Sequence, residues 1–208
     1  FDLSGNGHHA EALAGAPSWN ATSFNALPGV VLNQASLELM NSKIEFDGWN
    51  ELTVVASFYQ PTRRNFATLF GKANFVGWAG TVNNDLAWSV FSHRLDMPYN
   101  LWGPAIITDS SYECLNSGNT RVFQASEDGG PGLLLLSYES GSLSLRINGK
   151  VIHSSPHLSG TIQQKPELSV TIGGHANSSS LNHMVISEFM IFNEDLSVED
   201  RKSTRLNS

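Results

Sequence analysis

The chain has 208 residues, a formal net charge of −7 and a hydrophobic fraction of 40%. This length and apolar content suit one β domain with a substantial core and exclude wholesale disorder. Only 12 residues are Lys or Arg, against 19 Asp or Glu, so nucleic acid and anionic membranes are poor partners. The single cysteine, Cys114, excludes an internal disulfide framework. The longest apolar run, residues 133–136, is far too short for membrane insertion.

Short strands separated by Gly, Asn, Ser and Pro dominate the sequence, and almost no segment has the apolar period of a helix. In chain order, strands are predicted at residues 42–46, 51–60, 66–72, 85–95, 121–126, 132–139, 142–147, 150–152, 167–173 and 183–192. The clearest strand is 51–60, in which both alternating faces are apolar enough for the interior of a sandwich. The expected fold is all-β, with two antiparallel sheets stacked as a jelly-roll sandwich.

Residues 142–152 give the best local signal, which is that of a β-hairpin. Leu143, Leu145 and Ile147 alternate with polar residues before Asn148 and Gly149. Asn-Gly suits a type I′ turn because both central residues need a positive φ. This segment is therefore expected to form two adjacent antiparallel strands.

We expect one domain over residues 1–199, because no internal repeat and no linker-like segment interrupts the pattern. Residues 200–208 match the translation of a widely used sequencing adapter. They are therefore expected to be an assembly artefact rather than natural protein.

Three segments, taken together, resemble the laminin-G-like members of the concanavalin A-like lectin/glucanase superfamily. They are Asp-Leu-Ser-Gly-Asn-Gly at residues 2–7 with Ile-Glu-Phe-Asp-Gly at 44–48, the strand–hairpin–strand at 134–152, and the Ile-Gly-Gly segment with its closing strand at 170–196. The resemblance implies a two-sheet jelly roll that is exported from the cell, most often as a binding module of a larger protein. Related domains usually have a strand before the first segment, so the N-terminus is expected to be truncated.

Carboxylates for glycan cleavage are sparse. Hydrolases of the superfamily place acidic residues at alternate positions of one strand, and the nearest match is Glu45 with Asp47. Gly48 and Asn50 favour a turn directly afterwards, which breaks the arrangement. The lyase motifs of this fold, a Gly-x-Ser-x-Gly elbow and a His-Glu-x-x-His motif are all missing from the sequence. An ordinary loop is therefore favoured over a catalytic pair, and no catalytic residue is predicted.

A structural calcium ion is a candidate cofactor. Glu188 alternates with Ile186, Met190 and Phe192, and a carboxylate on such an apolar face needs compensation. Asp2 and Asn6 would complete an oxygen ligand set for Ca²⁺. The resemblance supports this set, because the first and last strands of such jelly rolls are often neighbours. In the alternative arrangement, Val185, Phe189 and Ile191 face the core and Glu188 faces solvent.

Aromatic side chains in predicted loops are candidates for sugar binding, because a flat ring covers the apolar face of a sugar while polar neighbours bind its hydroxyls. Trp88 lies within a predicted strand and is expected in the core. The predicted ligand-binding residues are Trp78, Asn84, Arg94, Tyr99, Asn100 and Trp102. For each aromatic residue, packing beneath a loop is the alternative.

The leading hypothesis is a non-catalytic, secreted module that binds a polysaccharide or a glycoprotein glycan. A protein-interaction or adhesion module, bound to another extracellular protein, is the first alternative. A glycoside hydrolase or polysaccharide lyase of concanavalin A-like fold, using Glu45 and Asp47, is the second.

Overall fold

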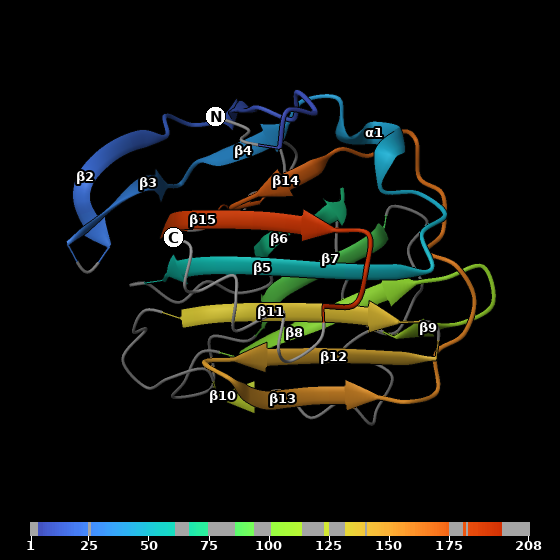
Figure 1. Cartoon of the computed structure of the whole chain (residues 1–208). Coiled ribbons are helices and arrows are strands. Elements are labelled where there is room, and N and C mark those ends of the chain that lie inside the picture. The colour runs from blue at the N-terminus through green and yellow to red at the C-terminus, as the bar shows by residue number, and fades with distance from the viewer. Residues whose placement is uncertain are drawn as a thin grey trace.

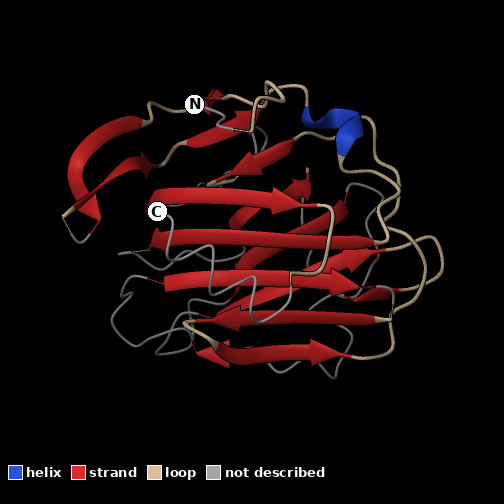
Figure 2. Ribbon diagram, in the orientation of Figure 1, coloured by secondary structure: helices blue, strands red, loops and turns tan. Residues whose placement is uncertain are grey.

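The computed structural model describes residues 4–24, 26–60, 67–74, 86–93, 101–113, 123–124, 132–139, 141–174, 181 and 183–196. These residues form two stacked antiparallel sheets (Figures 1 and 2). In spatial order, the first sheet contains β1 (Ala10–Ala14), β4 (Ser36–Leu39), β14 (Val170–Ile172), β6 (Ala67–Ala73), β7 (Leu86–His93), β8 (Leu101–Ile107) and β10 (Phe123–Gln124), with β9 (Tyr112–Glu113) also paired to β8. The second contains β13 (Lys150–Ser155), β12 (Ser142–Ile147), β11 (Gly132–Glu139), β5 (Glu51–Tyr59), β15 (His183–Phe192), β3 (Leu27–Asn33) and β2 (Ser18–Phe24).

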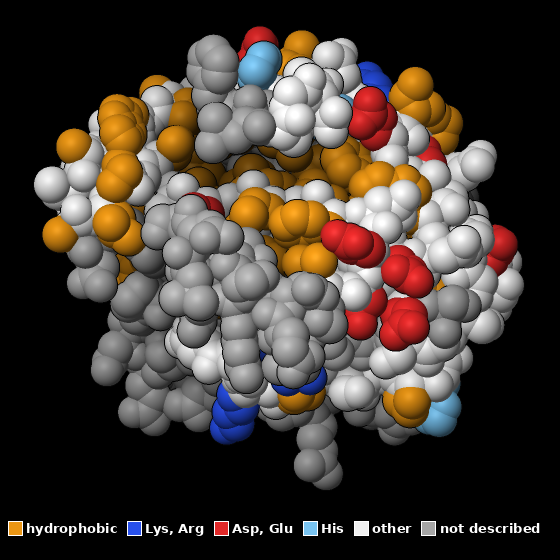
Figure 3. Space-filling view, viewed as in Figure 1, with side chains coloured by type: hydrophobic (Ala, Val, Ile, Leu, Met, Phe, Trp, Pro, Cys, Tyr) orange, Lys and Arg blue, Asp and Glu red, His pale blue; other side chains and the backbone are white. Residues whose placement is uncertain are grey.

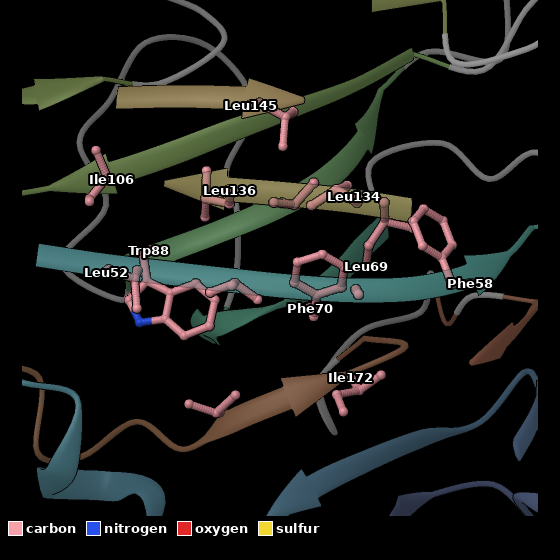
Figure 4. Close-up of a cluster of buried hydrophobic side chains, with 14 of the residues drawn as sticks. Leu52, Phe58, Leu69, Phe70, Trp88, Ile106, Leu134, Leu136, Leu145 and Ile172 are labelled. Carbon is pink, nitrogen blue, oxygen red and sulfur yellow. The ribbon is translucent and has the colours of Figure 1, made fainter. Parts of the chain in front are cut away.

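The core lies between the sheets and consists of the inward-facing residues of both. Figure 4 shows Phe70 and Trp88 of the first sheet against Leu52, Leu134 and Leu136 of the second. All five side chains are fully buried, and the burial of Trp88 confirms its expected place in the core. Each buried side chain of this size contributes about 1.5–3 kcal/mol relative to an exposed position. Alternation of apolar residues along each strand therefore accounts for the stacking of the two layers.

The predicted hairpin is present as β12 and β13. Asn148 has φ 51° and Gly149 has φ 82°, which are the positive values that a type I′ turn requires. Leu143, Leu145 and Ile147 are buried on the core side. The turn is also held from outside, because Asn148 Oδ1 accepts the backbone N–H of Leu133 at 2.9 Å.

The predicted strand at residues 42–46 is wrong, because Ser42–Glu45 form the short helix α1. Asn41 has a left-handed φ of 58° and turns the chain at the end of β4. The buried Ser42 hydroxyl then donates to Leu39 O at 2.6 Å and accepts the backbone N–H of Val170 at 2.9 Å. These two bonds, of which the one from Val170 is long-range, outweigh the local preference of the segment. No helix within the described residues is long and apolar enough to cross a membrane.

The other predicted strands are present, with shifted ends in several cases. The sequence did not predict β1, β2, β3, β4, β8 and β9. β2 and β3 form a hairpin that extends beyond the edge of the first sheet (Figure 1).

Candidate functional site

A row of residues runs across five strands on the outer face of the first sheet. Strand register places the members side by side in the order Glu11, Glu38, Thr171, Gly71, Ser89. Trp88 points into the core, and successive residues of a strand point to opposite faces, so Ser89 and its neighbours in the row point away from it. Neighbouring strands lie about 4.8 Å apart, so the row from Glu38 to Ser89 is about 14 Å long. We call these five residues the outer row.

Gly71 lets β7 pack closely against β6 in the outer row. A Cβ atom at this position would lie 2.5 Å from both Cα and Cβ of Ser89 and 2.5 Å from Trp88 O. No larger residue fits without a shift of the β7 backbone. A strand glycine of this kind often marks a place where another group approaches the backbone closely. β6 therefore has no side chain between Thr171 and Ser89.

Two hydroxyl groups flank Gly71 and are buried without a hydrogen bond to any described residue. Ser89 is 0% and Thr171 is 4% exposed, and neither hydroxyl oxygen has a partner in the part of the chain that the structure describes. A buried hydroxyl without a partner costs about 1–3 kcal/mol, and native proteins contain few such groups. A ligand bearing hydroxyl or amide groups would satisfy both.

The free edge of the outer row is acidic. Glu38 is half-buried and Glu11 is exposed, and they lie directly opposite each other on β4 and β1. Like charges in this cross-strand arrangement repel each other, so the pair adds no stability to the sheet. Its carboxylate oxygens are acceptors for the hydroxyl hydrogens of a ligand.

The predicted sugar-binding residues belong to the same part of the chain, although most lie outside the described residues. Trp78 and Asn84 fall between β6 and β7, and Arg94, Tyr99 and Asn100 fall between β7 and β8. Trp102 belongs to β8, where its backbone pairs with Ser92 and Phe123, but its side chain is not among those described. In the sequence, Trp78 and Asn84 precede β7, whereas Arg94, Tyr99 and Asn100 follow it. The two segments therefore connect β7 to its antiparallel neighbours, β6 and β8.

Two of the predicted calcium ligands, Glu188 and Asn6, belong to different parts of the sandwich. Glu188 is exposed on β15 of the second sheet, whereas Asn6 is exposed ahead of β1 of the first, and Asp2 lies outside the described residues. A bulge between Ile186 and Glu188 turns Phe189 and Ile191 toward the core. The Glu188 carboxylate therefore needs no cation to offset burial. Within the described ranges, no group of three His, Cys, Asp or Glu residues could hold a metal ion.

The candidate catalytic carboxylates, Glu45 and Asp47, have separate partners. Glu45 Oε2 lies 2.5 Å from His8 Nε2. Asp47 forms a buried ion pair with Lys72, and its other oxygen accepts the backbone N–H of Lys165 at 2.9 Å. Burial lowers the pKa of Lys72, while the hydrogen bond and the charge of Asp47 act in the opposite direction. Asp47 therefore anchors the turn after α1 to β6.

A further polar cluster joins the turn after β8 to residues 159–161. Asp109 accepts hydrogen bonds from the Ser110 hydroxyl and from the backbone N–H and hydroxyl of Thr161. These bonds, with that from Ser110 the largest cause, lower the pKa of Asp109. Tyr138 donates to Gly160 O at 2.6 Å, and burial raises the pKa of this phenol. Because the donors and acceptors of the cluster bind one another, its role is structural.

Sequence reasoning missed Gly71, Ser89 and Thr171. A small polar residue beside Trp88 in an otherwise apolar strand was the available signal for Ser89. Thr171 and Gly71 had no such signal, because only the strand register brings them together.

The fold is similar to those of several solved structures. Domain 4 of AbnA, a GH43 extracellular arabinanase from Geobacillus stearothermophilus solved in complex with arabinotriose, aligns with a TM-score of 0.63 and 14% identity over 100% of this chain and 92% of that one. The binding domain of Paraclostridial Mosquitocidal Protein 1 aligns with a TM-score of 0.61 and 15% identity over 99% of this chain and 48% of that one. No protein-family model and no curated protein sequence matches the chain.

A third similar structure is that of botulinum neurotoxin type C, whose cell entry depends upon interaction with two ganglioside molecules. It aligns with a TM-score of 0.58 and 13% identity over 99% of this chain and 47% of that one. The chain therefore spans about half the length of both toxin chains. At these identities the comparisons show the fold alone, which is the predicted two-sheet antiparallel jelly-roll sandwich.

Proposed function

We propose that the chain is a non-catalytic carbohydrate-binding module of laminin-G-like type from an exported protein, and that its outer row contacts the glycan. The observation that carries this proposal is the pair of buried hydroxyls, Ser89 and Thr171, on either side of Gly71. The hydroxyls of a sugar both donate and accept hydrogen bonds, so they match these two unsatisfied groups. Gly71 brings the two hydroxyls toward each other, because it lets β7 pack closely against the β6 backbone.

The residues around this row support the same ligand class. Glu38 and Glu11 extend the row with acceptors for sugar hydroxyls. The chain segments after β6 and β7 contain Trp78 and Tyr99, whose rings would stack on the apolar face of a sugar. A binding surface with polar groups on a sheet and aromatic groups in the adjoining loops is typical of carbohydrate recognition.

The ligands of the similar structures suggest which glycans to test first. One of these proteins was solved with arabinotriose and another depends on gangliosides for cell entry. Arabino-oligosaccharides and ganglioside-derived oligosaccharides are therefore the first probes, followed by a broad glycan array.

Isothermal titration calorimetry of single variants tests the site. We expect Ser89→Ala and Thr171→Val each to weaken binding about tenfold, which corresponds to about 1.4 kcal/mol. Ser137→Ala is a matched control, because Ser137 lies on the second sheet and bonds to the Ser144 hydroxyl at 2.8 Å. Unchanged affinity in both outer-row variants would remove the site from the proposal.

The proposal also predicts that the chain leaves the glycan intact. Because Glu45 and Asp47 are each engaged with a different basic residue, the proposal gives them no roles as nucleophile and acid. Assays for reducing ends and for unsaturated products, with each bound glycan as substrate, should therefore show no cleavage. Cleavage that depends on Glu45 or Asp47 would instead establish an enzyme.

A further inference from the structure

An apolar groove opens between β15 of the second sheet and the β1–β4 edge of the first. Val30, Trp49, Phe189 and Ile191 are half-buried and pack against the core along it. Figure 3 shows the groove as a hollow lined by hydrophobic atoms. The Trp49 ring meets that of Phe46 edge-on, with centroids 5.1 Å apart.

One wall of the groove is the edge of β15, which is paired over only part of its length. β3 pairs with β15 only at residues 183–186, whereas β5 pairs with it over residues 185–192. Among the described residues, no strand therefore pairs with residues 188–192 on the side opposite β5. A strand edge of this kind presents backbone N–H and C=O groups that can pair with another strand.

The bulge in β15 supplies an apolar floor beside this edge. After it, Phe189 and Ile191 point to the core side, and the Phe189 ring lies 5.3 Å from that of Phe70. A strand laid along residues 188–192 would place alternate side chains on the same floor. Both the backbone edge and the side-chain spacing therefore fit an extended peptide.

The two ends of the groove differ in charge. Glu51, Glu139 and Glu194 gather near the C-terminal end of β15, since Glu51 pairs with Glu139 and Asp195 N donates to Glu51 Oε2 at 3.0 Å. No ion pair of these three glutamates occurs in the described part of the chain. Figure 3 shows acidic side chains beside this end of the groove. By contrast, residues 12–37, which include β2 and β3, contain no charged residue.

We propose that this groove binds an extended peptide strand of another protein by strand addition to residues 188–192 of β15. The peptide has apolar residues at alternate positions, which cover Phe189 and Ile191. A Lys or Arg follows its last apolar residue and lies near Glu194. An acyl chain fits the floor equally well, but it cannot pair with the backbone edge of β15.

A synthetic peptide tests the proposal with the 208-residue chain. The probe is an acetylated, fluorescent octapeptide, Thr-Val-Thr-Ile-Thr-Val-Lys-Lys, and its affinity is measured by fluorescence polarisation. We expect saturable binding, and at least tenfold weaker binding when proline replaces the central Ile, because proline cannot donate to the added strand. Equal binding of both peptides would overturn strand addition.

Charge reversal tests the orientation. Glu194 is exposed, and only its backbone oxygen bonds to Thr53 among the described contacts, so Glu194→Lys leaves that bond in place. The variant should bind the lysine-ended peptide about threefold more weakly and recover affinity for a glutamate-ended peptide. Glu167→Lys, at an exposed position outside the groove, is the matched control and should bind as the wild type does.

Hydrogen exchange locates the bound peptide, and competition with a fatty acid distinguishes a peptide groove from a lipid groove. The peptide should slow amide exchange at residues 188–192, and dodecanoate should not displace it. Displacement by dodecanoate without protected amides would identify a lipid groove and overturn the proposal. Ser89→Ala should leave peptide binding unchanged. Failure of the peptide proposal can therefore be distinguished from failure of the glycan proposal.

Discussion

Lys72 on β6 and Asp47 in the turn after α1 form an ion pair in which both side chains are buried. Lys72 also donates to Lys43 O at 2.5 Å, and Asp47 accepts the backbone N–H of Lys165 at 2.9 Å. The pair therefore joins the α1 turn, β6 and the segment before β14. A buried ion pair adds little net stability compared with apolar packing, but removal of one partner leaves an uncompensated charge.

Removal of the carboxylate should be costly. We expect Asp47→Ala to lower the free energy of unfolding by about 3–5 kcal/mol, because Lys72 then stays buried without its counter-charge. Urea unfolding measures the loss. The double variant Asp47→Leu with Lys72→Met should recover most of it. A loss below about 1 kcal/mol for Asp47→Ala would mean that solvent reaches the pair.

Protonation of Asp109 at acid pH should lower the stability of the folded protein. Its pKa is lower in the folded protein than the ordinary 3.8, so its stabilising contribution is present above pH 3.8 and is lost as the pH falls through the folded value. Asp109→Asn should therefore lower Tm at pH 7, and the difference from wild type should shrink as the pH falls below 3.8. Ser110→Ala, which removes the largest cause of the shift, should give a smaller difference with the same pH trend. A difference in Tm that is constant from pH 7 to pH 2 would contradict this role for Asp109.

Substitution of two buried serines on opposite sheets by alanine should change the free energy of unfolding in opposite directions. Ser89→Ala removes a hydroxyl that has no partner among the described residues and should raise the free energy of unfolding by about 1 kcal/mol. Ser137→Ala breaks the bond to the Ser144 hydroxyl and should lower it by about 1 kcal/mol. Paired denaturation curves without ligand measure both. Destabilisation by Ser89→Ala would indicate that its hydroxyl is already satisfied.

The β12–β13 turn should be sensitive to its glycine. Gly149 has φ 82°, and a residue with a Cβ atom pays about 1–2 kcal/mol in this conformation. We expect Gly149→Ala to lower stability by that amount without steric clash, since nothing lies within 4 Å of the added Cβ. Lys150→Ala, one residue further along and exposed, is the control that should change Tm little.

The sequence predicted best the strands in which side-chain alternation is strong. β5, β11, β12 and β15 have regular apolar positions and form the centre of the second sheet. β1 to β4 were missed because residues 10–39 contain small and polar residues in both phases. β3 and β4 also pair with β15 and β14, which are distant in the chain. α1 was mistaken for a strand because the bonds of Ser42, one of them to Val170, decide its conformation.

The candidate site was harder to predict than the fold. The outer row joins Thr171, Gly71 and Ser89, which are up to 100 residues apart, through strand register that no local pattern encodes. Aromatic loop residues could be singled out because their chemistry is visible residue by residue. The need for glycine at position 71 becomes visible only when β7 is packed beside β6.

The order of the strands has a consequence for biosynthesis. β14 separates β4 from β6, and β15 separates β3 from β5, so each layer is divided by a strand from the last forty residues. Neither sheet can complete its strand pairing until the ribosome has released nearly the whole domain. During translation the earlier strands therefore wait with unpaired edges, which makes this a slow-folding topology that is vulnerable to premature aggregation.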